Sequence, residues 1–191
     1  MQEKRRKRPR RITPQYLERA ALHHLERYAT SSENLRRVLA RKVWKAARLS
    51  EEEGAVDEEQ AAAWIEEVVA RLQRAGALND RAYAEGRVVS LRRQGESTRG
   101  IAMKLSAKGV PRETVEAALD LDEPENDDVA AAVAYARRRR LGPWRKAEER
   151  EERHDRDMAA LARKGYGLEL CRKVIEAPDI EAAEDIARGE D

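Results

Sequence analysis

The chain has 191 residues, and 40% of them are charged, with 39 basic residues against 37 acidic ones for a formal net charge of +2. Only 4% are aromatic and Phe is absent, while the good helix formers Ala, Leu, Glu and Arg dominate. This composition argues against an all-β or Rossmann-type fold, and the single cysteine, Cys171, excludes an intrachain disulfide framework. No apolar run is long enough to span a membrane or to serve as a secretory signal, so a soluble, intracellular, helical protein is expected.

The charges lie in blocks along the chain. Residues 1–11 carry seven basic residues against Glu3 alone, and we expect residues 1–12 to form a disordered basic tail. Residues 50–60 and 120–128 each carry six acidic residues and no basic one. A charge run is either a solvated surface or an electrostatic contact with a partner, so these blocks alone do not define a function.

Helix start and stop signals divide the chain into nine helices in three sets of three. Capping patterns precede apolar runs of helical spacing, as at Thr30–Glu33 and Asp57–Gln60, and glycines such as Gly76 stand where helices should end. The predicted organisation is a first repeat over 13–78 that contains an acidic insert, a second over 79–122, a third over 123–178 and a C-terminal tail over 179–191.

One short phrase occurs in all three sets. It reads Leu-Ala-Arg-Lys-Val from Leu39, Leu-Ser-Ala-Lys-Gly from Leu105 and Leu-Ala-Arg-Lys-Gly from Leu161. Each copy supplies a Leu for the core and a Lys in the last turn, where the helix dipole favours a cation. Any helical hairpin can end in this way, but three copies with similar neighbours favour true repeats packed side by side along an axis.

The sequence of these repeats resembles that of the RecX family. Leu78–Ala84, Arg93–Gly95 and Ile101–Val110 are similar to the central repeat of the family, Leu161–Tyr166 to its third, and 31–42 more loosely to its first. The resemblance implies an all-α fold of three tandem three-helix repeats in a curved, elongated array.

The chain departs from the family pattern at a few positions. Asn34 stands where Glu is usual, Val43-Trp44 replaces a Gly-aromatic pair, and Val110 and Tyr166 stand where Phe is common. These departures fall mostly in the first repeat.

The resemblance also implies a function. RecX proteins regulate the RecA recombinase, so this chain is expected to be a monomeric, cytoplasmic bacterial protein that binds the RecA nucleoprotein filament in its groove. It would inhibit the ATPase, strand-exchange and co-protease activities of RecA and thereby regulate DNA repair and the SOS response. Non-specific contacts with single- or double-stranded DNA would be secondary.

Catalytic and cofactor motifs are missing from the sequence. It contains neither a phosphate-binding loop nor a dinucleotide-binding glycine motif. His23, His24 and His154 are too scattered to form a zinc site with Cys171, which is expected to be buried as a small apolar residue. We therefore expect no enzyme activity, no cofactor, no metal and no membrane association.

Basic side chains are the remaining functional signal. They can neutralise phosphates without reading sequence, or they can contact acidic protein surfaces. The expected RecA- and DNA-binding residues are Arg92, Arg93, Arg99, Lys104, Lys108, Arg137, Arg138, Arg140, Lys146, Arg163 and Lys164.

Few aromatic side chains are available for stacking on bases. Trp64, Tyr83 and Tyr166 are expected in the core, whereas Trp144, among basic residues, is expected to be exposed or to face a partner. A dedicated single-strand stacking platform is not supported.

Two other classes of protein fit parts of the sequence. A helix-turn-helix regulator would also contain three-helix units, but its third helix should carry Arg, Asn and Gln, whereas the second repeat has Glu113 and Glu116 there. A passive helical-repeat scaffold would bind neither RecA nor DNA.

Overall fold

The computed structural model describes residues 11–49, 57–121 and 128–189. These residues form ten α-helices and one short 3₁₀ helix, and no strand occurs among them. The all-α fold is therefore confirmed. Residues 1–10 of the basic tail expected over 1–12, the acidic insert over 50–56 and the acidic linker over 122–127 lie outside the described residues. Ile12 is described and is buried in the core of the first unit, so the expected disordered tail is wrong at this residue. None of the described helices is both long and apolar enough to cross a membrane.

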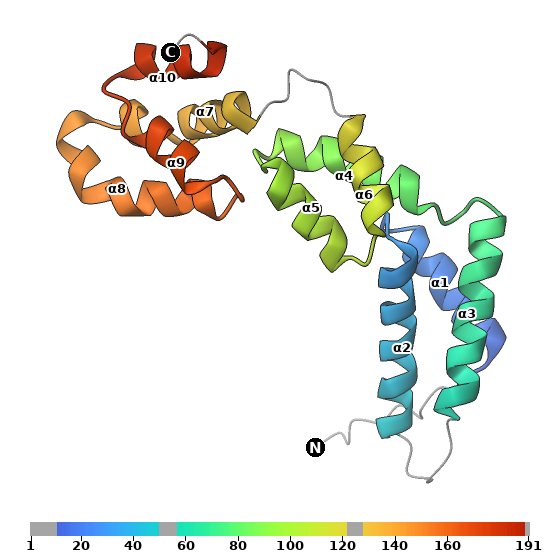
Figure 1. Ribbon diagram of the computed structural model, residues 1–191. Coiled ribbons are helices and arrows are strands. Elements are labelled where there is room, and N and C mark those ends of the chain that lie inside the picture. The colour runs from blue at the N-terminus through green and yellow to red at the C-terminus, as the bar shows by residue number, and fades with distance from the viewer. Residues whose placement is uncertain (1–10, 50–56, 122–127, 190–191) are drawn as a thin grey trace, which may run out of the picture. The chain divides into compact units, whose positions relative to one another are not determined.

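The chain, whose helices are labelled in Figure 1, divides into two compact units. The first contains the chain up to Tyr83 together with Lys108–Val110, and the second contains Ala84–Ala107 and the chain from Pro111 onward. The start of one helix, α4, thus belongs to the first unit and the rest to the second.

The first unit is built on three helices, α1 (Pro14–Leu25), α2 (Ser32–Leu49) and α3 (Glu58–Arg74). They enclose a core whose most buried large side chains include Leu17, Leu35 and Leu39. The partly buried Trp64 packs against this core, as expected.

Side-chain caps start these helices. Thr13 and Asp57 accept hydrogen bonds from backbone amides three residues ahead, as N-caps do. At α2, Ser31 rather than Thr30 caps the helix, because Ser31 Oγ accepts the hydrogen bond of the Asn34 amide at 3.2 Å.

The second repeat consists of α4 (Asp80–Arg93), α5 (Thr98–Ala107) and α6 (Arg112–Asp120). Its buried apolar side chains come from all three helices and include Val88, Ile101 and Val115. Tyr83, expected in this core, is only partly buried.

The third repeat consists of α7 (Asp128–Arg139), the 3₁₀ helix η2 (Gly142–Trp144), α8 (Ala147–Ala162) and α9 (Leu168–Ile175). Its core contains Leu161, Val174 and Cys171, and the burial of the cysteine confirms its expected structural role. Trp144 is partly buried and packs against this core, so the expectation of a partner-facing tryptophan is not supported.

The structure adds a helix that the sequence interpretation lacks. Residues Ile180–Arg188, within the segment expected to be a C-terminal tail, form α10. Asp179 caps this helix by accepting a hydrogen bond from the Ala182 amide at 2.9 Å, and the fully buried Ala183 is part of it. Because α10 contacts both α7 and α9, it completes the packing of the third repeat.

Helix α7 ends in an unusual way. Arg140 adopts a φ of 54° and is the non-glycine residue with positive φ in the described chain. Its amide bonds to the Arg137 carbonyl and the Leu141 amide to the Ala136 carbonyl, which is the Schellman pattern that normally has glycine at this position. A side chain there costs about 1–2 kcal/mol relative to glycine.

We predict that Asp179→Ala loosens α10 locally. Loss of the N-cap should reduce helix stability by about 1 kcal/mol. Hydrogen exchange at the α10 amides should accelerate roughly fivefold, which is the corresponding change in the opening equilibrium. Glu181→Ala, an exposed change in the same helix, serves as the control. Equal exchange rates in the two variants would show that Asp179 does not stabilise α10.

Candidate functional site

A backbone contact joins the second and third repeats in the second unit. The Ser97 amide, just before α5, donates a hydrogen bond to the Lys164 carbonyl, just after α8, at 3.0 Å. The Asp128 carboxylate at the start of α7 accepts hydrogen bonds from the amide and the hydroxyl of Thr98, at 2.8 and 2.9 Å. Both ends of this contact satisfy polar groups that helix termini leave unpaired.

An equivalent arrangement occurs in the first unit. Ser31 Oγ donates to the Lys108 carbonyl, and the Ser32 amide donates to Asp80 Oδ1 at 2.6 Å. Asp80 opens α4 as Asp128 opens α7, and Lys108 follows α5 as Lys164 follows α8. The same residue types therefore make the same kind of contact twice, which we call the repeat junction.

The Lys-Gly phrase is explained by this junction. Gly165 has a φ of +93°, and a Cβ atom on it would lie 2.5 Å from Ser97 Oγ and 2.8 Å from Gly100 Cα. A Cβ on Gly100 would in turn collide with the Lys164 carbonyl oxygen. In the first repeat Val43 takes the place of this glycine, and there α2 continues to Leu49 with Val43 buried in the core.

A buried carboxylate binds two of the predicted site residues at the second junction. Glu96 is only 2% exposed, and its Oε1 lies 2.5 Å from Lys104 Nζ and 2.7 Å from Lys164 Nζ. Burial acts to raise the pKa of Glu96, but the hydrogen bonds and positive charges of the two lysines outweigh it and lower the pKa. Lys104 and Lys164 are thus engaged within the protein.

Arg92 is also occupied within the second unit. Its side chain is 10% exposed and lies 2.7 Å from Asp128 Oδ1, and it donates further hydrogen bonds to Thr98 Oγ1 and the Glu96 carbonyl. A guanidinium with these partners holds the start of α7 against the start of α5.

The other predicted site residues have exposed side chains with fewer partners. Lys108 approaches Asn34 Oδ1 at 3.5 Å, and Arg137 approaches Glu184 at 3.7 Å. Arg138 donates to the Arg93 carbonyl and covers the ring of Tyr135. No ion pair with a described residue is found for Arg93, Arg99, Arg140, Lys146 and Arg163.

The structure brings some of these residues together with others that the sequence interpretation missed. Arg138, Arg140 and Arg163 line one pocket of the third repeat. The pocket also contains Arg139, Arg145, Arg153 and Arg156. The available signal was the helical spacing of Arg153, Arg156 and Arg163. These residues are three, seven and ten positions apart, and residues at such separations share one face of a helix.

The junction residues Glu96, Ser97 and Asp128 were missed as well. Their role depends on partners about 30–70 residues away in sequence, for which helical periodicity gives no signal. Among the described residues, no three His, Cys, Asp or Glu side chains come together as a set of metal ligands.

Consecutive three-helix repeats with a recurrent junction define a helical-repeat protein. Comparison with known proteins shows which kind. The profile described as "RecX, second three-helix domain" matches residues 79–119, which includes α4, α5 and α6 up to Leu119. The "Regulatory protein RecX" of Myxococcus xanthus is 46% identical over 172 residues, or 90% of each chain, and that of Agrobacterium fabrum is 48% identical over 110 residues, covering 58% of this chain and 57% of the relative.

The chain belongs to the RecX family. A solved structure, "Crystal structure of RecX from Lactobacillus salivarius", has the same fold, with a TM-score of 0.54 at 20% identity, covering 85% of this chain and 94% of the other. The curated relatives are named as regulatory proteins.

We predict that Glu96→Gln lowers the free energy of unfolding by about 2 kcal/mol, because the charge that holds two lysines at the junction is removed. Since the pKa of Glu96 is lowered in the folded protein, its stabilising contribution is present above pH 4.5 and is lost as the pH falls through the folded-state pKa. Urea unfolding at pH 7 and in mild acid measures both effects. Glu116→Gln, whose partner Arg112 is 90% exposed, should change the stability by less than about 0.5 kcal/mol. Equal losses in both variants would contradict the assignment.

The hydroxyl of Tyr166 gives a second test of the junction. It donates to the Gly95 carbonyl at 3.2 Å, and burial raises the pKa of the phenol. Tyr166→Phe leaves this carbonyl without its partner and should reduce the free energy of unfolding by about 1 kcal/mol in urea titrations. The matched change Tyr28→Phe, at an exposed tyrosine in the segment after α1, should have no effect. A neutral Tyr166→Phe would exclude this hydrogen bond as a stabilising contact.

Proposed function

We propose that this protein regulates the RecA recombinase by binding its nucleoprotein filament and inhibiting its ATPase, strand-exchange and co-protease activities. The observation that carries the proposal is the 46% identity to a curated RecX regulatory protein over 90% of both chains. The protein would act by binding rather than by catalysis, as a monomer in the bacterial cytoplasm.

The contact with the filament is assigned to exposed cations of the second and third repeats. Arg93 and Arg99 flank the turn between α4 and α5, and no ion pair with a described residue occupies them. Because cations on such a surface attract an acidic partner and set its register, they are suited to a filament of protein and DNA. Arg137, Arg138, Arg140, Lys146 and Arg163 extend the proposed surface onto the third repeat.

Three residues of the original set receive a different part in this proposal. Arg92, Lys104 and Lys164 bind Asp128 and Glu96 inside the second unit. We assign them to positioning the second and third repeats, while the free cations make the contact. Their loss would impair regulation through lost stability rather than through lost binding groups.

Several weak contacts are sufficient for such a function. A repeat protein can present separate patches to neighbouring subunits of a filament, and each additional patch then binds at a high effective concentration. This supports a place for the protein in the filament groove and inhibition below one molecule per RecA subunit.

The RecA ATPase tests the proposal. Wild-type protein at about one molecule per ten RecA subunits should inhibit the DNA-dependent ATPase, since each bound molecule affects several subunits. Arg93→Ala/Arg99→Ala should require about tenfold more protein for the same inhibition, with an unchanged melting temperature. Arg41→Ala/Lys45→Ala, which removes the same charge from exposed positions of α2, is the matched control.

Two outcomes would contradict the proposal at different levels. Wild-type protein that neither inhibits the ATPase nor binds preformed filaments would exclude RecA regulation. Equal weakening by the control variant would exclude the second repeat as the specific contact.

A further inference from the structure

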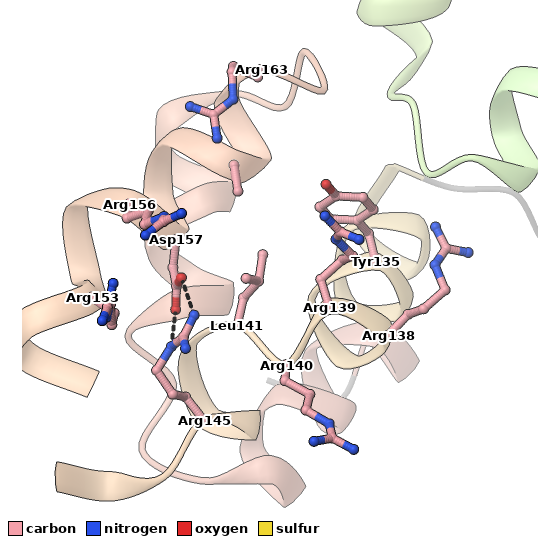
Figure 2. A pocket seen from close by; sticks show the side chains of 11 residues that line it. Tyr135, Arg138, Arg139, Arg140, Leu141, Arg145, Arg153, Arg156, Asp157 and Arg163 are labelled. Atoms are coloured by element: carbon pink, nitrogen blue, oxygen red, sulfur yellow. Dashed lines mark hydrogen bonds and ion pairs between the residues drawn. The ribbon is translucent and has the colours of Figure 1, made fainter. Parts of the chain in front are cut away.

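The third repeat contains a pocket of about 530 Å³ in which seven of the eleven lining residues are arginines. Figure 2 shows Arg138, Arg139 and Arg140 from the end of α7 on one side, and the α8 arginines on the other. On the α8 side are Arg153 and Arg156 of the helix and Arg163 just after its end, and Arg145 reaches Asp157 on the same side. Seven arginines and a single carboxylate thus surround the same space.

The carboxylate is already neutralised. Asp157 is 1% exposed and binds Arg145 through both of its oxygens, at 3.0 and 2.7 Å, as the dashed lines in Figure 2 mark. Its Oδ2 also accepts the hydrogen bond of the Gly142 amide at 3.0 Å. Because these bonds satisfy Asp157, it forms part of the fixed wall and does not balance the other arginines.

Most of the remaining arginines have no acidic partner among the residues that the structure describes. Arg139, Arg140, Arg156 and Arg163 make no ion pair with any described residue. Arg153 is 3.4 Å from Glu152, which is itself 76% exposed. Concentrating like charges in one cavity is unfavourable in the absence of an anion, so this arrangement indicates a ligand.

The backbone provides an independent observation. Arg140, which lines the pocket, has a positive φ. At other helix ends of this chain, such as Gly76 and Gly95, the residue in this conformation is a glycine. Strain of this kind is found preferentially where a side chain serves binding. The retained arginine thus adds a positive charge at the edge of the pocket, with its side chain directed away from Asp157 (Figure 2).

The lining favours phosphate over other anions. Guanidinium groups bind phosphate through paired hydrogen bonds, and the pocket contains no lysine. Acidic peptides usually add an apolar anchor in a desolvated centre, but here the apolar lining is limited to Leu141, Ala160 and the largely buried Tyr135. A nucleic-acid strand needs no such anchor, because release of its condensed counterions contributes to the affinity.

The pocket offers no aromatic surface for a base. The ring of Tyr135 is 9% exposed, and the cations of Arg138 and Lys164 lie against it at 5.7 and 5.4 Å from its centre. Bases would consequently stay outside, and recognition would not depend on sequence. The volume is that of a small-ligand site, which admits a sugar-phosphate strand rather than a duplex.

We propose that this pocket binds the phosphate backbone of single-stranded DNA without sequence preference. The proposal deepens the proposed function, on which its biological meaning rests, by giving the DNA strand of a filament a site in the third repeat. The binding itself requires no RecA, so it is tested with DNA alone and its failure is distinct from failure of the ATPase test.

Fluorescence anisotropy with labelled 20-nucleotide oligothymidine provides the test. Arg156→Ala/Arg163→Ala should weaken binding about tenfold at low salt and reduce the slope of log affinity against log salt by about 1.4, which is about 0.7 for each lost phosphate contact. The control Arg41→Ala/Lys45→Ala removes the same charge outside the pocket and should bind within about twofold of wild type. Oligoadenosine should bind as oligothymidine does.

Three results would overturn the proposal. Equal weakening in the control variant would show that only net charge matters. Displacement of the DNA by polyglutamate at equal concentrations of charge would identify an acidic protein segment as the ligand class. Tighter binding of a 20-base-pair duplex than of the single strand would also contradict it.

A second variant separates binding from folding. Arg140→Gly removes a cation from the pocket and also relieves the positive φ, so its melting temperature should rise by about 2–4 °C while its affinity for oligothymidine falls severalfold. A destabilised protein cannot account for that combination. If the Arg140→Gly variant is stabilised but binds oligothymidine with wild-type affinity, Arg140 does not contribute to DNA binding in the pocket.

Discussion

The hydrogen bond between the Ser97 amide and the Lys164 carbonyl is the contact on which the second unit is organised. It brings the start of one helix against the end of another, where each has backbone groups without helical partners. Three side chains next to this hydrogen bond pair with groups that the approach of the two backbones brings together. Glu96 binds Lys164, Asp128 accepts from the Thr98 amide, and Tyr166 donates to the Gly95 carbonyl. The glycines at 100 and 165 are required by the same approach.

The sequence was sufficient for most of the fold. Caps such as Asp57, terminal glycines and apolar spacing specify helices locally, so their number and order in the three repeats could be predicted. Helix α10 was missed because Pro178 suggested an end, and because a nine-residue helix depends on packing against α7 and α9 for its stability.

The candidate site could be predicted only in part. Lys104 and Lys164 were recognised as candidate binding cations, but Glu96, the carboxylate that binds them, is distant from Lys164 in sequence. Cations without an acidic partner and cations paired with a buried carboxylate look the same in sequence, and only the tertiary structure separates them. The convergence of the arginines of α7 and α8 on one pocket likewise depends on the tertiary structure, and the sequence pattern alone does not show it.

The repeat junction has a polarity. In the two junctions described, Ser31-Ser32 or Ser97-Thr98, at the start of the second helix of one repeat, meets the Asp and the Lys-Gly of the next. An interface of this head-to-tail kind joins two different surfaces, so a further repeat can be added as long as each repeat carries both halves. The third repeat has the accepting half, but Lys146, with no side-chain cap bond, stands at the start of α8 in place of a serine. A designer who wished to add a further repeat after the third would therefore begin at Lys146, where this donating half is missing.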